Sequence, residues 1–384
     1  MRWTTLEDPA ERARIQGEMD RFWQAFAARE ERIDALFRMQ DRWDLVGWMN
    51  AKLAPIVPGL LWEFGPGAEG GHRLVITPES RRHLRPLVAE LVARAPKLKG
   101  WTFQDARPPD GPEITVNMVQ GRAGLDISAA QVAVAAGELN RIDLRWHIPG
   151  VNPKDRQAFE AAFLATQCIL GERVLDDWIG MIDCVPPEAG LRGWKTLPVQ
   201  VHAARSKLLD TLPSQPLHQR SPHDLEYTLW KLEPPEPTDG DYPTQTDLRI
   251  GKSCDPPMWV AAHARPEIFA SERFSRHGEL YAYIKVDGRE EAPEEAFQDK
   301  SEIEDALDKV LREAGVGAFC GGGTGNWYSY VDLLLTDLDA AIPLIRKTLR
   351  QGQVHKRCWL LFMDPALAQD WVGIYEDTPP PPGL

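Results

Sequence analysis

The chain has 384 residues, 43% of them hydrophobic and 26% charged, a length that favours two domains and a composition that excludes global disorder. Its net charge of −13 is uneven, because residues 1–210 hold 27 Lys and Arg against 28 Asp and Glu, whereas residues 211–384 hold 17 against 29. The acidic second half repels phosphate backbones, which argues against nucleic-acid binding there.

The N-terminal half begins with helical patterns. Ile15, Met19, Phe22 and Phe26 recur every three or four residues, which predicts an amphipathic helix. Strand and helix patterns then alternate, with predicted strands at 60–64, 73–77, 100–103, 113–118 and 141–146 and predicted helices at 84–95 and after residue 128. This order contains a split β-α-β-β-α-β unit.

The last hundred residues repeat that order. Residues 280–286 alternate as a strand does, and Ser301-Glu302-Ile303-Glu304 predicts a capping box at the start of a helix. Further patterns predict strands at 316–320, 327–335 and 357–363, with a second helix beginning at Asp339. We therefore predict an α+β fold with two ferredoxin-like antiparallel-sheet domains and an N-terminal helical segment.

Proline-rich punctuation suggests where the domains divide. Residues 1–210 would hold the N-terminal helices and the first α+β domain, and residues 211–250 a proline-rich linker. Residues 251–378 would form the acidic second α+β domain, followed by a disordered tail at 379–384.

Chemical motifs are scarce. Five scattered cysteines form no C-x-x-C pair, and nine histidines include no H-E-x-x-H motif, so we expect no metal and no cofactor. The first eight residues are polar and unlike a signal peptide, and every apolar run is far shorter than the ~20 residues that span a bilayer. We expect a cytoplasmic protein that does not bind membranes.

A glycine-rich stretch gives one candidate site, which includes Gly322, Gly323, Thr324 and Asn326. A phosphate-binding loop needs a following helix and, in the Walker form, a lysine. Here no lysine follows and the stretch runs into a predicted strand. We interpret it as a mobile hairpin turn, with contact to a ligand as the alternative.

Aromatic residues and one carboxylate follow in that strand. Alternation places Asp332 on the same face as Tyr328 and Tyr330, just after Trp327. We interpret the face that carries Asp332 as exposed or partner-binding. For the aromatic residues we favour packing in the core, with a recognition platform for a partner or ligand as the alternative.

A compact basic patch gives the remaining candidates. Arg81, Arg82 and Arg85 at a predicted helix start could receive a phosphate or carboxylate, although a solvated turn explains them as well. No spacing selects a nucleophile–His–acid set, so we assign no catalytic residue.

Two resemblances can be drawn. The segments Leu61-Trp62-Glu63, Leu74-Val75-Ile76-Thr77, Ala95-Pro96 and Gly100-Trp101 resemble bacterial proteins classed as domains of unknown function. The C-terminal order, with Val331-Asp332-Leu333 and Asp337 before a helix, is similar to immunity and regulatory proteins with ferredoxin-like sheets. These resemblances imply no activity and no catalytic residue.

Two functions fit these patterns. The first is a non-catalytic binding or regulatory protein whose acidic C-terminal domain, with the run of acidic residues at 290–295, engages a basic protein partner. The alternative is a small-molecule enzyme with an anion-binding pocket between the domains. The sequence favours the first and does not indicate an oligomeric state.

Overall fold

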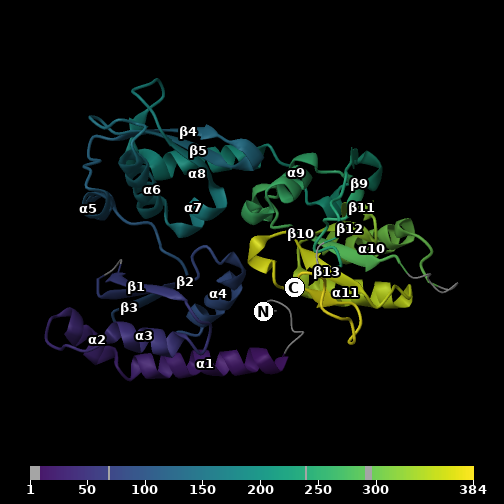
Figure 1. Ribbon diagram of the computed structural model, residues 1–384, viewed down its shortest axis with the longest axis horizontal. Coiled ribbons are helices and arrows are strands. Elements are labelled where there is room, and N and C mark those ends of the chain that lie inside the picture. The colour runs from purple at the N-terminus through teal and green to yellow at the C-terminus, as the bar shows by residue number, and fades with distance from the viewer. Residues whose placement is uncertain (1–8, 68–69, 238–239, 290–295) are drawn as a thin grey trace.

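The computed structural model describes residues 9–67, 70–237, 240–289 and 296–384. The fold is α+β and contains three separate β-sheets within these residues (Figure 1). We call the parts around these sheets the N-terminal body (residues 9–104), the middle body (residues 112–210) and the C-terminal body (residues 217–384). Across the described chain, no helix is both long and apolar enough to cross a membrane.

The N-terminal body has four α-helices packed with a three-stranded sheet. Its elements are α1 (Pro9–Ala27), α2 (Glu30–Phe37), α3 (Leu45–Leu53), β1 (Leu61–Pro66), β2 (His72–Thr77), α4 (Arg85–Ala93) and β3 (Trp101–Gln104). Strands β1 and β2 are antiparallel, and α4 returns the chain so that β3 pairs parallel with β2. The helical pattern of α1 is confirmed, because its apolar residues are buried and the ring of Phe26 lies 5.0 Å from that of Trp101.

The middle body is built on a four-stranded sheet of order β6-β5-β4-β7. Its elements are α5 (Pro112–Ala123), β4 (Gln131–Ala136), β5 (Ile142–His147), α6 (Arg156–Leu170), α7 (Glu172–Trp178), β6 (Ile179–Cys184), β7 (Arg192–Gly193) and α8 (Leu197–Asp210). The helices bury apolar side chains against this sheet, with Trp146 and Trp178 in the core.

The predicted single β-α-β-β-α-β unit of the N-terminal half is wrong. Residues 113–118 lie in helix α5, because Pro112 occupies its first turn and Gly124 ends it in the left-handed conformation. Residues 132–136 form strand β4 and not a helix, because Val132 is buried against β5 and packing there overrides the helix preference of alanine. The strands of this half are divided between two sheets.

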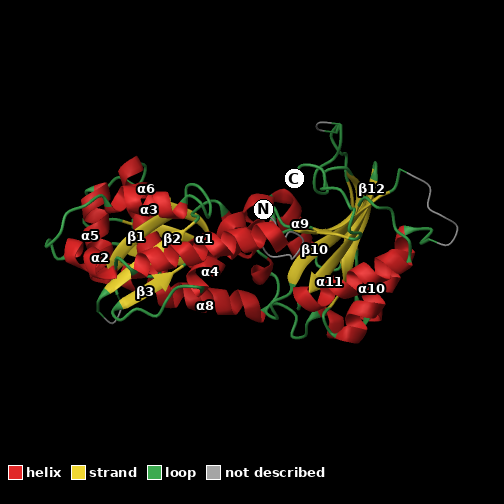
Figure 2. Ribbon diagram, turned by 90° about the horizontal axis from the view of Figure 1, so that it is seen from below, coloured by secondary structure: helices red, strands yellow, loops and turns green. Residues whose placement is uncertain are grey.

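The C-terminal body contains a seven-stranded sheet of order β14-β13-β10-β12-β11-β9-β8. Its elements are β8 (Thr228–Lys231), β9 (Leu248–Ser253), α9 (Pro256–Ala264), β10 (Leu280–Asp287), α10 (Lys300–Ala314), β11 (Gly317–Gly325), β12 (Tyr328–Leu335), α11 (Leu338–Gln351), β13 (Cys358–Phe362) and β14 (Val372–Gly373). All neighbouring strands are antiparallel. Figure 2 shows α10 and α11 together on one side of this sheet.

The β-α-β-β-α-β order predicted for this half is confirmed by β10, α10, β11, β12, α11 and β13. Two details differ. Helix α10 is capped by Asp299, whose carboxylate accepts from the amides of Ser301 and Glu302, so the cap lies two residues before the predicted one. The glycine-rich stretch belongs to strand β11, which pairs with β9. Gly321 is needed there because a side chain would collide with the Lys252 carbonyl of β9.

The segments predicted as linker and tail both contact the sheet. Residues 211–250 supply strand β8 and part of β9. In residues 379–384, the Pro379 carbonyl accepts a hydrogen bond from the Trp359 indole at 2.6 Å. The division into domains at residues 210, 250 and 378 stays a prediction.

Candidate functional site

The two faces of the C-terminal sheet differ in chemistry. Alternation in β10 places Ala282, Ile284 and Val286 on the face that packs against α10 and α11. The opposite face, which we call the polar sheet face, consists of Tyr281, Tyr283, Lys285, Asp287, Tyr328, Tyr330 and Asp332. Strand register pairs Tyr283 with Asp332 and Lys285 with Tyr330. All seven side chains are buried.

A loop of residues 241–247, which we call the clamp loop, crosses this polar sheet face. Lys285 Nζ donates to the Tyr242 carbonyl at 2.5 Å, and the Tyr330 hydroxyl donates to the Thr244 carbonyl at 3.2 Å. The Gln245 amide donates to Asp332 Oδ1 at 2.9 Å. Lys285, Tyr330 and Asp332 of the sheet therefore find hydrogen-bond partners in this loop, as is usual for buried polar groups.

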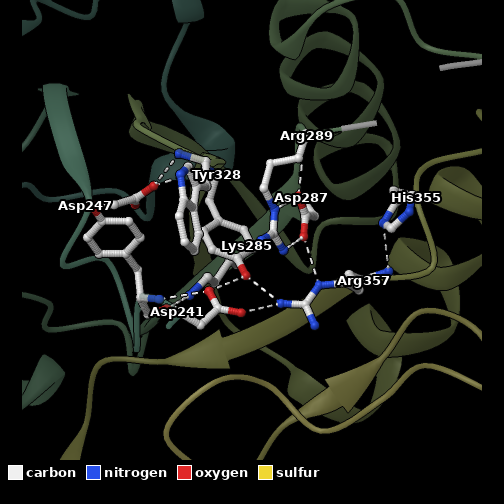
Figure 3. Close-up of polar contacts among 10 residues, drawn as sticks. Asp241, Asp247, Lys285, Asp287, Arg289, Tyr328, His355 and Arg357 are labelled. Atoms are coloured by element: carbon white, nitrogen blue, oxygen red, sulfur yellow. Dashed lines mark hydrogen bonds and ion pairs between the residues drawn. The ribbon is translucent and has the colours of Figure 1, made fainter. Parts of the chain in front are cut away.

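One end of the polar sheet face is a cluster of charges. Figure 3 shows Arg357 reaching toward both Asp241 and Asp287. Arg357 Nε donates to Asp287 Oδ2 at 2.7 Å and its Nη2 to Asp241 Oδ2 at 2.6 Å. The Tyr328 hydroxyl donates to Asp241 Oδ1 at 2.7 Å, and Arg289 adds a second guanidinium on Asp287. We call these five residues the charged cluster.

The charged cluster neutralises itself. Burial, the largest influence, raises the pKa of Asp287, but hydrogen bonds from Arg289 and Arg357 outweigh it and bring that pKa down to about 2. Burial lowers the pKa of the neighbouring Lys285 to about 8, against the opposing charges of Asp247 and Asp241. The Lys285 ammonium also lies 4.0 Å from the centre of the Tyr328 ring.

The other end of the polar sheet face borders a cavity of about 450 Å³. Its walls are largely apolar and include Pro243, Ala262, Leu361 and Met363. The polar side chains that line it include Gln245 of the clamp loop, His263 of α9 and Tyr283 of β10. A mainly apolar cavity of this size with a few converging polar groups is typical of small-molecule sites.

The Tyr283 side chain lines the cavity, and its hydroxyl makes no hydrogen bond within the described residues. Its side chain is only 2% exposed, and its hydroxyl has no hydrogen-bond partner among the described residues. Burial, followed by the nearby Asp332 charge, raises the pKa of Tyr283, so the hydroxyl stays protonated at neutral pH. It is a hydrogen-bond donor that faces the cavity.

Behind Tyr283 runs a chain of hydrogen bonds from Tyr281 through Asp332 and Gln245 to His263. The Tyr281 hydroxyl donates to Asp332 Oδ2 at 2.8 Å. His263 Nε2 lies 2.7 Å from Gln245 Oε1, and its Nδ1 lies 2.8 Å from the Trp259 carbonyl. Both ring nitrogens therefore face oxygens, whereas a neutral imidazole has one N–H to donate.

The protonation of Asp332 and His263 is coupled through the Gln245 amide. Burial raises the pKa of Asp332 to about 6, against hydrogen bonds from Tyr281 and Gln245. Burial lowers the pKa of His263 to about 4, against its bond to the Trp259 carbonyl. A protonated Asp332 with a neutral His263 is satisfied when the Gln245 amide is rotated by 180°, since its oxygen then accepts from Asp332 and its nitrogen donates to the ring.

The clamp loop is held in an uncommon conformation where it forms the cavity wall. Thr244 has a φ of 46°, which is unusual for a β-branched residue. It is held in place because the sheet donates to the carbonyls of Tyr242 and Thr244, and because the Gln245 amide donates to Asp332.

Three of the residues predicted to form a site lie on the polar sheet face. They are Tyr328, Tyr330 and Asp332, while Trp327 lies in the β11–β12 turn, where its amide donates to Asp247 at 2.8 Å. The alternation that grouped them is confirmed. The predicted exposure of this face is wrong, because the clamp loop and α9 cover it, whereas the favoured packing of Tyr328 and Tyr330 in the core is confirmed.

The predicted glycine-rich site is divided. Gly322 and Gly323 lie inside β11, Thr324 lies near its end, and Asn326 lies in the turn. The Asn326 amide donates to the Tyr242 hydroxyl at 3.1 Å, which ties the turn to the clamp loop. A role for these residues in ligand contact stays a prediction.

The predicted basic patch lies in the N-terminal body, away from the polar sheet face. Arg85 binds Asp176 and Asp177 of α7 at 2.5 and 2.7 Å. Arg82 donates to the Asp176 carbonyl, and Arg81 donates to backbone carbonyls. Arg82 and Arg85 therefore link the N-terminal and middle bodies, whereas Arg81 bonds within the N-terminal body.

A second cavity of about 310 Å³ lies where the alternative hypothesis places an anion site, between the bodies. Arg82 and Arg85 line it, but so do the carboxylates of Asp177, Glu279 and Asp364. The mixture of charges does not favour an anion. Elsewhere in the described chain, no group of three or more His, Cys, Asp or Glu could hold a metal.

Sequence reasoning missed His263, Gln245 and Tyr283 as lining residues. The alternation of β10 places Tyr283 beside Asp332, so that one could have been found. Gln245 lies in a proline-rich stretch and His263 near the end of an alanine-rich helix, and neither follows a periodic pattern that marks it.

Comparison of the chain with protein families, with curated proteins and with solved structures gives no match.

Proposed function

We propose that the C-terminal body binds a small molecule in the 450 Å³ cavity beside the polar sheet face. The observation that carries this proposal is the Tyr283 hydroxyl, a donor on a largely buried side chain that has no hydrogen-bond partner among the described residues. A ligand with an acceptor oxygen could accept a hydrogen bond from this hydroxyl, and such a bond contributes about 0.5–1.5 kcal/mol.

The surroundings of Tyr283 support the same proposal. The wall opposite the sheet is the clamp loop, whose Thr244 has backbone strain of the kind that clusters at functional sites. Asp332 and His263 have strongly shifted pKa values beside the cavity, which is also typical of such sites.

The strand order β13-β10-β12-β11, with α10 and α11 on one face, supports the proposal that this body contains a ferredoxin-like domain. The cavity lies on the face opposite these helices. On that face, the register of β10 and β12 places Tyr283 and Asp332 side by side.

The hypothesis of a basic protein partner stays a prediction, and its support is now narrower. The aromatic residues that suggested a recognition surface are buried. The acidic run at 290–295 lies outside the described residues. The uneven charge of the two halves is what still supports it.

A fluorescence titration tests the proposed cavity. The probe is N-phenyl-1-naphthylamine, an uncharged molecule whose emission rises in apolar surroundings. Ala368 is exposed and lines the cavity, so Ala368→Trp should place an indole in its mouth and weaken binding by at least about tenfold, or about 1.4 kcal/mol.

The matched control is Ala340→Trp, an exposed alanine of α11 on the opposite side of the sheet. This variant should bind the probe as the wild type does. Equal binding by both variants, or no binding by the wild type, would contradict the proposed site.

A further inference from the structure

The polar side chains that line the cavity differ in whether their hydrogen-bond donors and acceptors already have partners. His263 has an oxygen beside each ring nitrogen, and Gln245 is engaged at both ends of its amide. The Tyr283 hydroxyl, by contrast, has no partner among the described residues. A ligand in the cavity therefore meets the unused donor of a largely buried tyrosine side chain.

The charges around the cavity disfavour an anion. Its described lining includes the carboxylates of Glu267 and Asp370 and contains neither Lys nor Arg. Glu267 is exposed and paired with Arg265 at 2.6 Å. Because burying an unpaired charge is costly, a carboxylate or phosphate ligand would find no compensating cation there.

The apolar walls determine the rest of the ligand. Pro243, Pro266, Leu361, Phe362 and Met363 offer hydrocarbon surface around the tyrosine. Such walls favour an aliphatic or aromatic body, and they offer few partners for several polar substituents.

We infer that the cavity selects an uncharged molecule with an apolar body and one acceptor oxygen, such as a carbonyl, placed against the Tyr283 hydroxyl. This inference rests on the proposed function and specifies its ligand class. The tyrosine acts as donor, and the specificity comes from the bond that an isostere without the oxygen cannot make.

Four molecules of nearly the same shape test this class. Acetophenone presents a carbonyl oxygen, α-methylstyrene replaces that oxygen with a methylene, benzoate carries a negative charge and benzamidine a positive one. Their dissociation constants are measured by saturation-transfer NMR titration on the full-length protein. We expect acetophenone to bind about fivefold more tightly than α-methylstyrene, and both ions to bind at least about tenfold more weakly than acetophenone.

The variant Tyr283→Phe removes the donor and keeps the ring. It should reduce the ratio between acetophenone and α-methylstyrene to about one, while leaving the affinity for α-methylstyrene unchanged within about twofold. Tyr227→Phe is the control, because Tyr227 packs against Phe319 and does not line the cavity. It should keep the wild-type ratio.

The outcomes separate the two proposals. Equal binding of acetophenone and α-methylstyrene to the wild type, or an unchanged preference in Tyr283→Phe, overturns the ligand class and leaves the cavity as a binding site. Tightest binding of benzamidine overturns it in favour of a cation held by Glu267 or Asp370. Failure of all four at millimolar concentration, together with failure of the naphthylamine probe, overturns both proposals.

Discussion

The two ends of the polar sheet face both contain tyrosine and aspartate side chains, but these side chains are bonded very differently. At the charged cluster, Arg357 bridges Asp241 and Asp287, and the Tyr328 hydroxyl completes the set. At the cavity, the Tyr283 hydroxyl has no partner among the described residues, and Asp332 is bonded by neutral groups alone. Polar side chains on a buried sheet face therefore do not by themselves indicate a binding site. What distinguishes the cavity end is bonding capacity left unused beside empty volume.

The largest effect is expected at the charged cluster. Asp287→Asn should lower the free energy of unfolding by about 3 kcal/mol at pH 7, because it leaves two guanidinium groups without their shared carboxylate. The pKa of Asp287 is about 2 in the folded protein and ordinarily 3.8. Its contribution is therefore complete above pH 4 and is lost as the pH falls toward 2. Urea denaturation at pH 7 and pH 3 measures both values.

Asp377→Asn is the control for that measurement. Asp377 and Lys356 also form an ion pair, but both side chains are more than half exposed. The substitution should change the free energy of unfolding by less than about 0.5 kcal/mol. Equal losses from the two substitutions would show that the ion pairs of the charged cluster stabilise the fold no more than an exposed ion pair does.

The next largest effect has the opposite sign and belongs to the cavity end. The pKa of Asp332 is about 6 in the folded protein against an ordinary value of 3.8, so the folded state favours its protonated form. The free energy of unfolding contributed by this group is present below pH 4 and is lost as the pH rises through 6. Asp332→Asn imitates the protonated carboxyl and should stabilise the protein by about 2 kcal/mol at pH 8.

The same substitution should have little effect near pH 4, where Asp332 is itself protonated. His263 titrates in both proteins, so its contribution largely cancels in the difference. Denaturation series at pH 4, 6 and 8 follow the change. A variant less stable than the wild type at pH 8 would mean that the charge of Asp332 is needed by the fold.

The smallest effects on the free energy of unfolding are expected when the hydroxyl of Tyr330 or of Tyr283 is removed. Tyr330→Phe should cost about 1–2 kcal/mol, because it removes the donor to buried Asp247. Tyr283→Phe should change the free energy of unfolding by less than about 0.5 kcal/mol, since its hydroxyl makes no bond to be lost. Thermal denaturation of the two variants measures the difference, and equal losses would remove the contrast between the two ends.

The sequence predicted those parts of the fold in which period and caps agree. Strand β10 alternates cleanly, and α10 has an apolar stripe that ends at Gly315, so both were found. The strand prediction for residues 113–118 was wrong. Ile114, Thr115 and Val116 have a strand-like pattern, whereas Pro112 and Gly124 mark the two ends of a helix. Local pattern and end signals disagreed there, and the end signals were decisive.

The candidate site could be predicted only in part, for a different reason. Alternation grouped Tyr328, Tyr330 and Asp332 correctly, but burial of that face depends on what crosses it. Gln245 reaches Asp332 across 87 residues of sequence. A long-range contact of this kind leaves no periodic signal in a proline-rich stretch, and so the cavity could not be seen before the fold was known.

The conformation of Thr244 has a consequence for how the cavity exchanges its contents. Backbone strain of about 1–3 kcal/mol at this residue would be released when the clamp loop swings away from the sheet. The loop is therefore expected to open as its own small cooperative unit, well before the strands separate. Amide hydrogen exchange at Gln245 and Thr246 should then be faster than at Val331 or Leu333 in the sheet, and an occupant of the cavity should slow it. Passage in and out would be governed by this segment, at a rate set by its own stability and not by that of the whole protein.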